Sequence, residues 1–271
     1  MTFANLLRVA PGSTPNLAAI DPRSTTGFEG DKAGSRARLK VLRDELGSFQ
    51  ERLWAEKRQS LLIVLQALDA GGKDGLIRKV ATAFNPQGTR VTGFGVPSEE
   101  ELHHDYLWRI HAATPGKGRI GVFNRSHYED VLVVRVNELV PEALWSARYD
   151  QINAFEAHLA ANGTRIVKFF LHISRAEQRE RFLKRLENPE KRWKWSSGDL
   201  DAREKWTAFQ AAYTDALARC STDVAPWFVV PADRKWYRDL AVAEILAETA
   251  AAMDPQWPEV DEDLSSIVVP E

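Results

Sequence analysis

The sequence predicts an α/β fold in which a mainly parallel sheet lies between two layers of helices. Short apolar runs that suit buried strands alternate with longer amphipathic segments that suit helices, and this alternation is typical of parallel sheets. The run 61–65, Leu-Leu-Ile-Val-Leu, is apolar throughout, as expected for a strand buried on both faces. The chain has 271 residues, 44% of them hydrophobic, so it can bury the core that such a sheet requires.

Each expected element follows from a local pattern. Leucine and aromatic residues recur at steps of three and four in 34–57, which indicates an amphipathic helix. Ser98 with Glu101, and Ser174 with Glu177, match the capping box that begins a helix. The expected strands are 61–65, 91–94, 119–123, 166–173 and 227–230, and the expected longer helices are 34–57, 73–84, 141–161 and 235–253.

These elements form a single expected domain, 35–255, and the composition changes on either side of it. Residues 1–34 are rich in Gly, Pro, Ser and Thr, so we expect this segment to be irregular. Residues 256–271 form an acidic tail that contains no Lys or Arg, which is typical of a solvated terminus.

The bulk composition excludes several classes of protein. The net charge of -2 argues against a general nucleic-acid or membrane binder, whose surface would be basic. The single cysteine, Cys220, cannot form an internal disulfide and suits a reducing compartment. No secretory signal is visible, and no apolar run is long enough to span a membrane. We therefore expect a cytoplasmic protein.

A glycine-rich segment, 67–75, lies between the first strand and the helix that follows it. Backbone N–H groups and the positive end of the helix dipole converge at such a place, so the segment is suited to bind phosphate. Lys73 adds a positive charge, and Gly71 and Gly72 leave space for phosphate oxygens. The segment therefore predicts a phosphate-binding loop.

This loop departs from the usual P-loop (Walker A) pattern G-x-x-x-x-G-K-[ST] at two positions. Ala67 replaces the first glycine, and Asp74 stands where a hydroxyl residue would hold Mg²⁺. Asp69 supplies a carboxylate that can hold the metal ion instead. The alternative interpretation is that Gly71-Gly72-Lys73 forms only a tight turn.

Polar residues also follow the expected strand 119–123. Ligands bind at the carboxyl ends of parallel strands, so Asn124 and Arg125 are expected beside the phosphate loop. Arg125 can neutralise charge on a transferred phosphoryl group. Alternatively, Asn124 caps a helix that begins near Ser126. We assign His127 to packing or hydrogen bonding rather than to proton transfer.

The segment 175–194 carries eight basic and four acidic residues, although the whole chain is slightly acidic. Breaks at Asn188-Pro189 and Ser196-Ser197-Gly198 divide the region into helices joined by a short tip. This pattern is typical of a lid, at about 175–205, that closes over a polyanion and excludes water. The alternatives are a solvated basic face and a single-stranded nucleic-acid site. The phosphate loop favours nucleotide or polyphosphate as the ligand.

Together these motifs resemble those of the family-2 polyphosphate kinases. The resemblance extends over about residues 35–250 and keeps the order of the motifs along the chain. The matching segments are 65–75 (LQALDAGGKDG), 85–88 (NPQG), 97–109, 121–133 (GVFNRSHYEDVLV), 189–194 (PEKRWK) and 225–235 (APWFVVPADRK).

The resemblance implies a three-layer P-loop kinase fold with a helical lid. It also implies phosphoryl transfer between inorganic polyphosphate and purine nucleotides with Mg²⁺, or alternatively Mn²⁺. The implied catalytic residues are Asp69, Lys73, Asn124 and Arg125, and Asp69 also holds the metal ion. The implied phosphate-binding residues are Ala70, Gly71, Gly72, Asp74, Gly75, Arg135, Lys191, Arg192 and Lys194, and the implied nucleotide-binding residues are Arg109, Asp130 and Arg185.

The acceptor is implied by fewer positions. Asn124, where other subgroups carry Asp, and the following Glu129-Asp130 resemble the subgroup that phosphorylates both nucleoside mono- and diphosphates. AMP and ADP, or GMP and GDP, are then the acceptors. The rival interpretations are an ATP-dependent nucleoside monophosphate kinase of the thymidylate type and a non-enzymatic binder of polyphosphate or nucleic acid. We also expect a homo-oligomer, because nine tryptophans are many to bury in one core.

Overall fold

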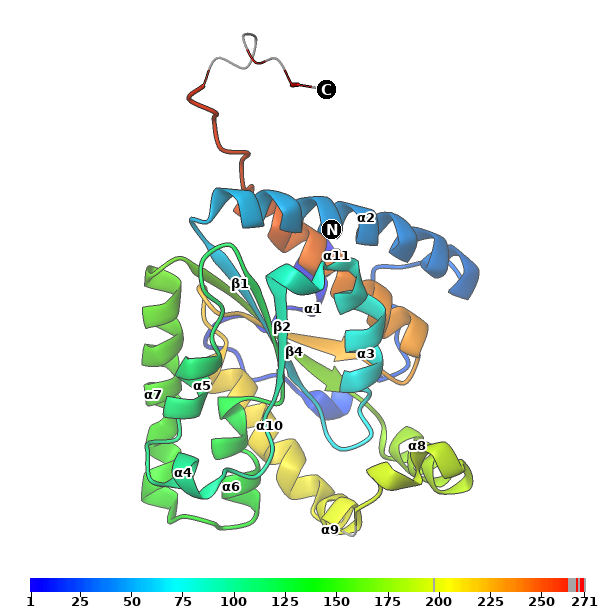
Figure 1. Cartoon of the computed structure of the whole chain (residues 1–271). Coiled ribbons are helices and arrows are strands. Elements are labelled where there is room, and N and C mark those ends of the chain that lie inside the picture. Colours follow the sequence, from blue (N-terminus) through cyan, green and yellow to red (C-terminus); the bar gives the residue numbers. More distant parts are fainter. Residues whose placement is uncertain (197, 263–266, 268, 271) are drawn as a thin grey trace.

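The computed structural model describes the whole chain except residues 197, 263–266, 268 and 271. Its centre is a five-stranded parallel sheet with the order β2-β3-β1-β4-β5. The strands are β1 (Ser60–Gln66), β2 (Thr89–Gly93), β3 (Ile120–Asn124), β4 (Thr164–His172) and β5 (Trp227–Pro231). Helices cover both faces of this sheet, which confirms the predicted three-layer α/β fold (Figure 1).

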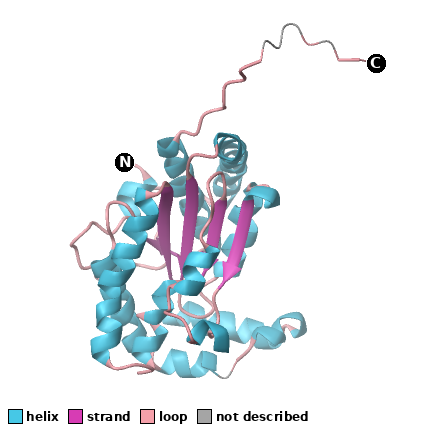
Figure 2. Cartoon of the chain, turned by 60° about the vertical axis from the view of Figure 1, so that its left-hand side comes forward, coloured by secondary structure: helices cyan, strands magenta, loops and turns pink. Residues whose placement is uncertain are grey.

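Two hydrophobic clusters lie between the sheet and the two helix layers, one on each face of the sheet. Alternate side chains of β1 point to opposite faces, so the strand contributes to both clusters. Figure 2 shows helices on both sides of the strands. One face is covered by α1 (Phe3–Leu7), α2 (Lys32–Glu56), α3 (Lys73–Val80) and α11 (Lys235–Met253). The other is covered by α5 (Trp108–Ala113), α6 (Val133–Val136), α7 (Glu142–Ala161) and α10 (Trp206–Cys220).

The remaining helical elements are short or lie outside these two layers. The α-helices are α4 (Glu99–Leu102), α8 (Arg175–Glu187) and α9 (Gly198–Glu204). The 3-10 turns are η1 (Leu17–Ala19), η2 (Ala81–Ala83), η3 (Pro86–Gly88), η4 (His127–Asp130) and η5 (Pro189–Lys194).

The central strand, β1, fixes where a ligand site can form. All of its residues are buried, as the apolar run predicted. Leu65 near its carboxyl end is level with Asn124 of β3 and with Phe169 of β4. The loops that follow these strands therefore meet at one edge of the sheet. In Figure 1, α8 and α9 lie beside this edge.

The N-terminal segment 1–34 is more regular than predicted, since it contains α1 and the first turn of α2. The backbone N–H of Phe3 donates to the Glu248 carboxylate of α11 at 3.0 Å. The N–H of Val9 donates to the Trp227 carbonyl of β5 at 2.9 Å. These distant contacts hold α1 against α11 and β5, although the local composition of the segment favours turns.

The two predicted capping boxes have different outcomes. Ser98 and Glu101 form a complete box at the start of α4, which confirms the first. At the start of α8, Ser174 accepts from the N–H of Glu177, but its own N–H donates to Asp233 at 2.8 Å. One of the two bonds of the second predicted box is therefore present and the other is not, because the Asp233 carboxylate after β5 replaces that of Glu177.

The described part of the tail 256–271 contains no helix or strand. Figure 1 shows it leaving the domain at the end opposite α8 and α9. The rest of the predicted acidic tail, and residue 197 of the predicted lid tip, lie outside the described residues. Within the described part of the chain, every helix is too short or too polar to cross a membrane.

A buried ion pair crosses the layer between β4 and α7. The side chains of Lys168 and Glu156 are 0% and 1% exposed, and they bond to each other. Lys168 also donates to the Tyr128 hydroxyl at 2.7 Å, and His127 bonds to Glu156 at 3.1 Å. This cluster anchors the segment that follows β3, and it gives His127 the hydrogen-bonding role that the sequence predicted.

Removing the cation of this pair should destabilise the fold strongly. We expect Lys168→Met to lower the free energy of unfolding by about 3–5 kcal/mol, because Glu156 is left as an unpaired buried charge. Chemical denaturation measures this loss. Lys184→Met is the matched control, since Lys184 pairs with Glu180 on the exposed surface of α8 and its loss should have no measurable effect. Equal effects of the two substitutions would contradict this view of the core.

Candidate active site

The loop between β1 and α3 adopts a conformation that exposes backbone N–H groups. Ala70 and Gly72 have φ angles of 59° and 100°, in the left-handed region. The N–H of Gly71 donates to the Leu68 carbonyl at 2.9 Å, so the loop does contain a tight turn. Gly72 is the N-cap of α3, and no side chain caps this helix. The N–H groups of its first turn are therefore available to an anion.

The sequence predicted that Gly71 and Gly72 leave space for phosphate oxygens, but the structure shows a different reason for glycine at these positions. A Cβ on Gly71 would lie 2.4 Å from the Ala67 Cβ and 2.7 Å from the Leu68 carbonyl oxygen. A Cβ on Gly72 would lie 2.2 Å from a guanidinium nitrogen of Arg238. Glycine at both positions is thus favoured by the packing of the loop against Ala67, Leu68 and Arg238, independently of any bound phosphate.

Two arginines hold the loop by its carbonyl groups. Arg181 of α8 donates to the Gly71 carbonyl at 3.0 Å, and Arg238 of α11 donates to the Gly72 carbonyl at 3.1 Å. The C=O and N–H of a trans peptide point in opposite directions. The N–H groups of Gly72 and Lys73 therefore point away from the arginines, toward the side on which a phosphate would bind.

Sequence reasoning missed this support. It counted Arg181 only among the bases of the lid and did not single out Arg238. Arg181 also donates to the carbonyls of Ala70 and Ala232, and Arg238 is 2% exposed. The available signal was the charged pair Arg238-Asp239 inside a helix that is otherwise mostly apolar.

Asn124 at the end of β3 and Arg125 after it face the loop as predicted. The Asn124 amide donates to the Asp74 carboxylate at 3.0 Å, and Arg125 donates to Asp69 at 3.0 Å. The alternative in which Asn124 caps the next helix is wrong, because Ser126 is the N-cap of η4. The cap therefore leaves the Asn124 side chain free to reach across to α3.

Charges of both signs surround Lys73. Its Nζ donates to the Ala67 carbonyl at 2.9 Å. Burial and then the positive charge of Arg125 lower the pKa of Lys73, and three nearby carboxylates oppose this shift. The carboxylates are Asp69, Glu129 and Asp74. This arrangement is suited to bind and neutralise phosphate oxygens.

The predicted lid contacts the loop region through Gln178 and Arg181 of α8 and also through one base of η5. Lys194 of η5 forms an ion pair with Asp74, and this hydrogen bond is the main cause of a lowered pKa for Asp74. Arg185 bonds instead to Asp199 of α9 at 2.8 Å. Arg192 donates to the Leu186 carbonyl at the end of α8, and Lys191 is exposed. The structure thus brings Lys194, but not the other three bases, to the loop.

Two of the three predicted nucleotide residues, Arg109 and Asp130, form a second group near β3, whereas the third, Arg185, lies on α8. Asp130 bonds to Arg148 at 2.9 Å, and the charge of Arg109 also acts on Asp130. Arg109 itself donates to the carbonyl of Gly95 and lies over a phenylalanine ring. Arg135, predicted to bind phosphate, is held by Asp215 at 2.6 Å and does not contact the loop in the described structure.

The fold and this edge define a P-loop phosphotransferase, since a lysine-containing phosphate loop follows the central strand of a parallel sheet. Residues 29–258 match the family described as Polyphosphate kinase 2 (PPK2). The chain therefore belongs to the polyphosphate kinase 2 family, and the predicted family, P-loop kinase fold and kinase class are confirmed.

Similar proteins cover almost the whole chain. It is 51% identical over 262 residues to an AMP/ADP-polyphosphate phosphotransferase of Meiothermus ruber, covering 97% of this chain and 98% of the relative. It is 44% identical to an ADP-polyphosphate phosphotransferase of Rhodopseudomonas palustris, covering 93% and 91%. The crystal structure of polyphosphate kinase 2 from Arthrobacter aurescens superposes with a TM-score of 0.94 at 43% identity, covering 98% of this chain and 95% of that one.

The contact between Gly72 and Arg238 predicts a large effect of one methyl group. We expect Gly72→Ala to lower phosphotransferase activity about 100-fold, because either the loop or the Arg238 guanidinium that holds the Gly72 carbonyl must shift. Gly12→Ala is the matched control, since Gly12 has a φ of 76° with nothing within 4 Å of the added atom. Both variants should lose about 1–2 kcal/mol of stability from the left-handed conformation. Equal activities of the two variants would show that the packing at Gly72 is unimportant.

The burial of Asp130 predicts a pH-dependent stability. Burial raises the pKa of Asp130 to about 6, so the carboxyl group binds its proton more tightly in the folded chain than in the unfolded one. Its contribution to stability therefore falls as the pH rises from about 4 to about 6. Relative to Asp130→Asn, the wild-type free energy of unfolding should fall by about 2–3 kcal/mol over this range. Chemical denaturation at several pH values measures both free energies of unfolding. If they changed with pH by the same amount in the two proteins, the raised pKa of Asp130 would be contradicted.

Proposed function

We propose that this protein transfers phosphoryl groups from inorganic polyphosphate to AMP and ADP, forming ADP and ATP. One observation carries the proposal. The phosphate loop, Lys73 and the facing pair Asn124-Arg125 form one site, in a chain 51% identical to a relative named for this reaction. GMP and GDP are proposed as further acceptors, since they are purine nucleotides like AMP and ADP.

The proposed mechanism uses alignment and charge neutralisation. The N–H groups of Gly72 and Lys73 and the Lys73 ammonium group would bind the transferred phosphoryl group. Arg125 would neutralise it from the β3 side. An oxygen of the acceptor nucleotide attacks the phosphorus, and the shortened polyphosphate leaves with the bonding electrons, so the protein need not supply a nucleophile.

The proposed metal ion is Mg²⁺, with Mn²⁺ as the alternative, and Asp69 is its proposed ligand. The described residues contain no group of three or more His, Cys, Asp or Glu that would form an all-protein metal site. This fits Mg²⁺, which is usually held by one or two carboxylates together with waters and substrate phosphates. When bound, the ion would neutralise charge on the phosphate oxygens. Asp69 suits this role because it is at the sheet edge beside Arg125.

The segment 175–205 is proposed to act as the lid. The ion pair between Lys194 and Asp74 supports this role, because it brings one base of the segment to the loop. A bound polyphosphate would compete for Lys194, and Lys191 and Arg192 would bind further phosphates. Arg185 would contact the nucleotide. Closure would exclude water, which would otherwise accept the phosphoryl group.

The acceptor nucleotide is proposed to bind beside Arg109 and Asp130. These residues lie close enough for the charge of Arg109 to lower the pKa of Asp130. A base or ribose that donates hydrogen bonds to a carboxylate would suit Asp130, while phosphates suit Arg109.

The cell compartment and the oligomeric state are also proposals. A cytoplasmic location agrees with the one cysteine, Cys220, which is free and buried. Self-association agrees with four exposed tryptophans in the described surface. These are Trp54, Trp108, Trp193 and Trp257.

One assay separates this function from its rivals. The protein is mixed with Mg²⁺, long-chain polyphosphate and either AMP or ADP, without added ATP, and ATP formation is measured. We expect ATP from both acceptors. Activity only with ATP as donor would instead support a nucleoside monophosphate kinase, and binding without turnover would support a non-enzymatic binder.

The loop lysine should be essential to this reaction. We expect Lys73→Ala to lower kcat/KM about 100-fold or more, because a cation aimed at the transferred phosphoryl group is lost. Binding of both polyphosphate and nucleotide should also weaken. Lys79→Ala, on the exposed last turn of the same helix, should keep full activity. Full activity of the Lys73→Ala variant would contradict the role assigned to this loop in phosphoryl transfer.

A further inference from the structure

Five exposed basic residues lie at the amino ends of the strands, at the end of the sheet opposite the phosphate loop. They come from the segments before β1 and β3 and from the start of β4. They are Lys57, Arg58, Lys117, Arg119 and Arg165, and we call them the amino-edge patch.

Backbone contacts connect the three segments of the amino-edge patch. The Gly118 N–H donates to the Gln59 carbonyl at 2.7 Å, which joins the segment before β3 to the segment before β1. The Leu61 N–H donates to the Arg119 carbonyl at 3.1 Å, and Leu61 is level with Arg165 of β4. The five residues therefore share one surface, although they are far apart along the chain.

The positive charge of the amino-edge patch is not neutralised locally. None of its five side chains forms an ion pair with another described residue. Arg119 donates to the Gln87 carbonyl at 2.7 Å and lies over the Trp54 ring. The neighbouring carboxylate, Glu56, accepts from the Gln59 amide at 3.1 Å instead. Since the whole chain has a net charge of -2, this concentration of cations is a local feature.

Grouped cations without carboxylate partners suit a ligand that carries repeated negative charges. Lysine and arginine bind phosphate oxygens through charge-assisted hydrogen bonds. Single-stranded nucleic acid would also need aromatic rings on which its bases stack. The Trp54 ring beside the patch already carries the Arg119 guanidinium, 4.6 Å from the ring centroid. The amino-edge patch therefore favours an inorganic polyanion over a nucleic acid.

The acidic tail is a rival occupant of the patch. It begins nearby, because the Gln256 N–H donates to the Glu56 carboxylate at 3.3 Å. Figure 1, however, shows the tail leaving the domain. Its described acidic residues form no ion pair with the patch. The patch is therefore open to a ligand from outside the chain.

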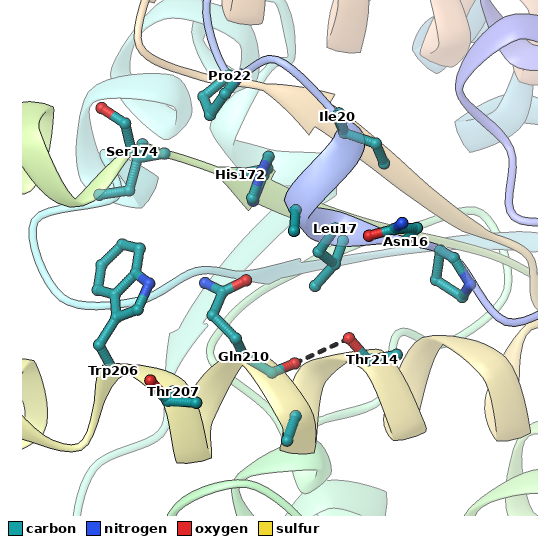
Figure 3. A pocket seen from close by; sticks show the side chains of 14 residues that line it. Asn16, Leu17, Ile20, Pro22, His172, Ser174, Trp206, Thr207, Gln210 and Thr214 are labelled. Atoms are coloured by element: carbon teal, nitrogen blue, oxygen red, sulfur yellow. Dashed lines mark hydrogen bonds between the residues drawn. The ribbon is translucent and has the colours of Figure 1, made fainter.

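The cavity in Figure 3 does not suit such a ligand. It has a volume of about 450 Å³ and lies between segment 15–22, the end of β4 and α10. Its described lining residues include no Lys or Arg, so it lacks the charge that would bind a polyanion.

The strand β1 separates the amino-edge patch from the phosphate loop. It has seven residues, and a strand rises about 3.3 Å per residue, so the two places are about 20 Å apart. A long polyphosphate can contact both places at once, whereas tetraphosphate is too short to do so.

We propose that the amino-edge patch is a second binding site for inorganic polyphosphate, which holds a distant part of a long chain while another part lies at the phosphate loop. Once one part of the chain is bound, binding of the other becomes intramolecular, and the overall affinity rises. This gain applies only to chains long enough to reach both places. The tethering of the donor rests on the proposed function, whereas binding to the patch does not.

Steady-state kinetics of a charge-neutralised variant of the full chain test this proposal. The double variant Arg58→Gln with Lys117→Gln should raise the KM for long-chain polyphosphate about tenfold and leave kcat unchanged, because the tether is weakened. The inhibition constant of tetraphosphate, which reaches the phosphate loop alone, should not change. The matched control is Arg36→Gln with Lys40→Gln, which removes the same charge from exposed positions of α2 and should change neither constant.

Other results would overturn the proposal. An unchanged KM in the patch variant would do so, as would an equal rise in the control variant, which would indicate general attraction by surface charge. Weaker inhibition by tetraphosphate would show that the substitutions disturb the active site. Single-stranded RNA that binds more tightly than polyphosphate, and only with the patch intact, would assign the patch to nucleic acid. An effect seen only after Glu259→Gln and Asp261→Asn would assign it to the tail.

A second measurement separates the patch from the proposed function. Calorimetry with long-chain polyphosphate and the full chain, without nucleotide, should show weaker binding by the patch variant than by the control variant. Equal binding by the two variants would overturn the patch as a binding site. A failure of the wild type to form ATP from polyphosphate would overturn the proposed function and leave the calorimetric result standing.

Discussion

The parallel pairing of β1 with β3 and β4 is the constraint on which the candidate site depends. Because these strands end level with one another, the loop after β1 and the segment after β3 meet at one edge. The bonds from Asn124 to Asp74 and from Arg125 to Asp69 cross from one strand end to the next. A change in register would separate these partners, although each local motif would be intact.

The phosphate loop depends on supports from distant parts of the chain. Gly71 and Gly72 allow its compact turn, but arginines from α8 and α11 fix the direction of its carbonyls. The same bonds connect the loop to α8, so the base of the proposed lid and the phosphate site form one unit.

The segment after β3 is anchored in a comparable way. His127 and Tyr128 bond to Glu156, which pairs with Lys168 inside the core. Such a pair contributes little net stability compared with apolar packing, but it is costly to break. It therefore holds the neighbouring Asn124 and Arg125 at the sheet edge, where small displacements would affect phosphoryl transfer.

The sequence by itself determined the features that depend on neighbouring residues. The apolar run at 61–65 predicted the buried strand, Ser98 and Glu101 predicted a complete cap, and the helix 235–253 has the predicted bounds. The order of the motifs also identified the family, because the phosphate loop and its facing segment are local strings of residues.

Only the tertiary structure decided how distant residues meet. Asp233 replaced Glu177 at the cap of α8, and Arg238 reached the loop from the far end of the chain. The N-terminal segment became ordered against α11 and β5. Contacts of this kind leave no periodic pattern in the sequence, because they depend on the positions of elements that are far apart along the chain.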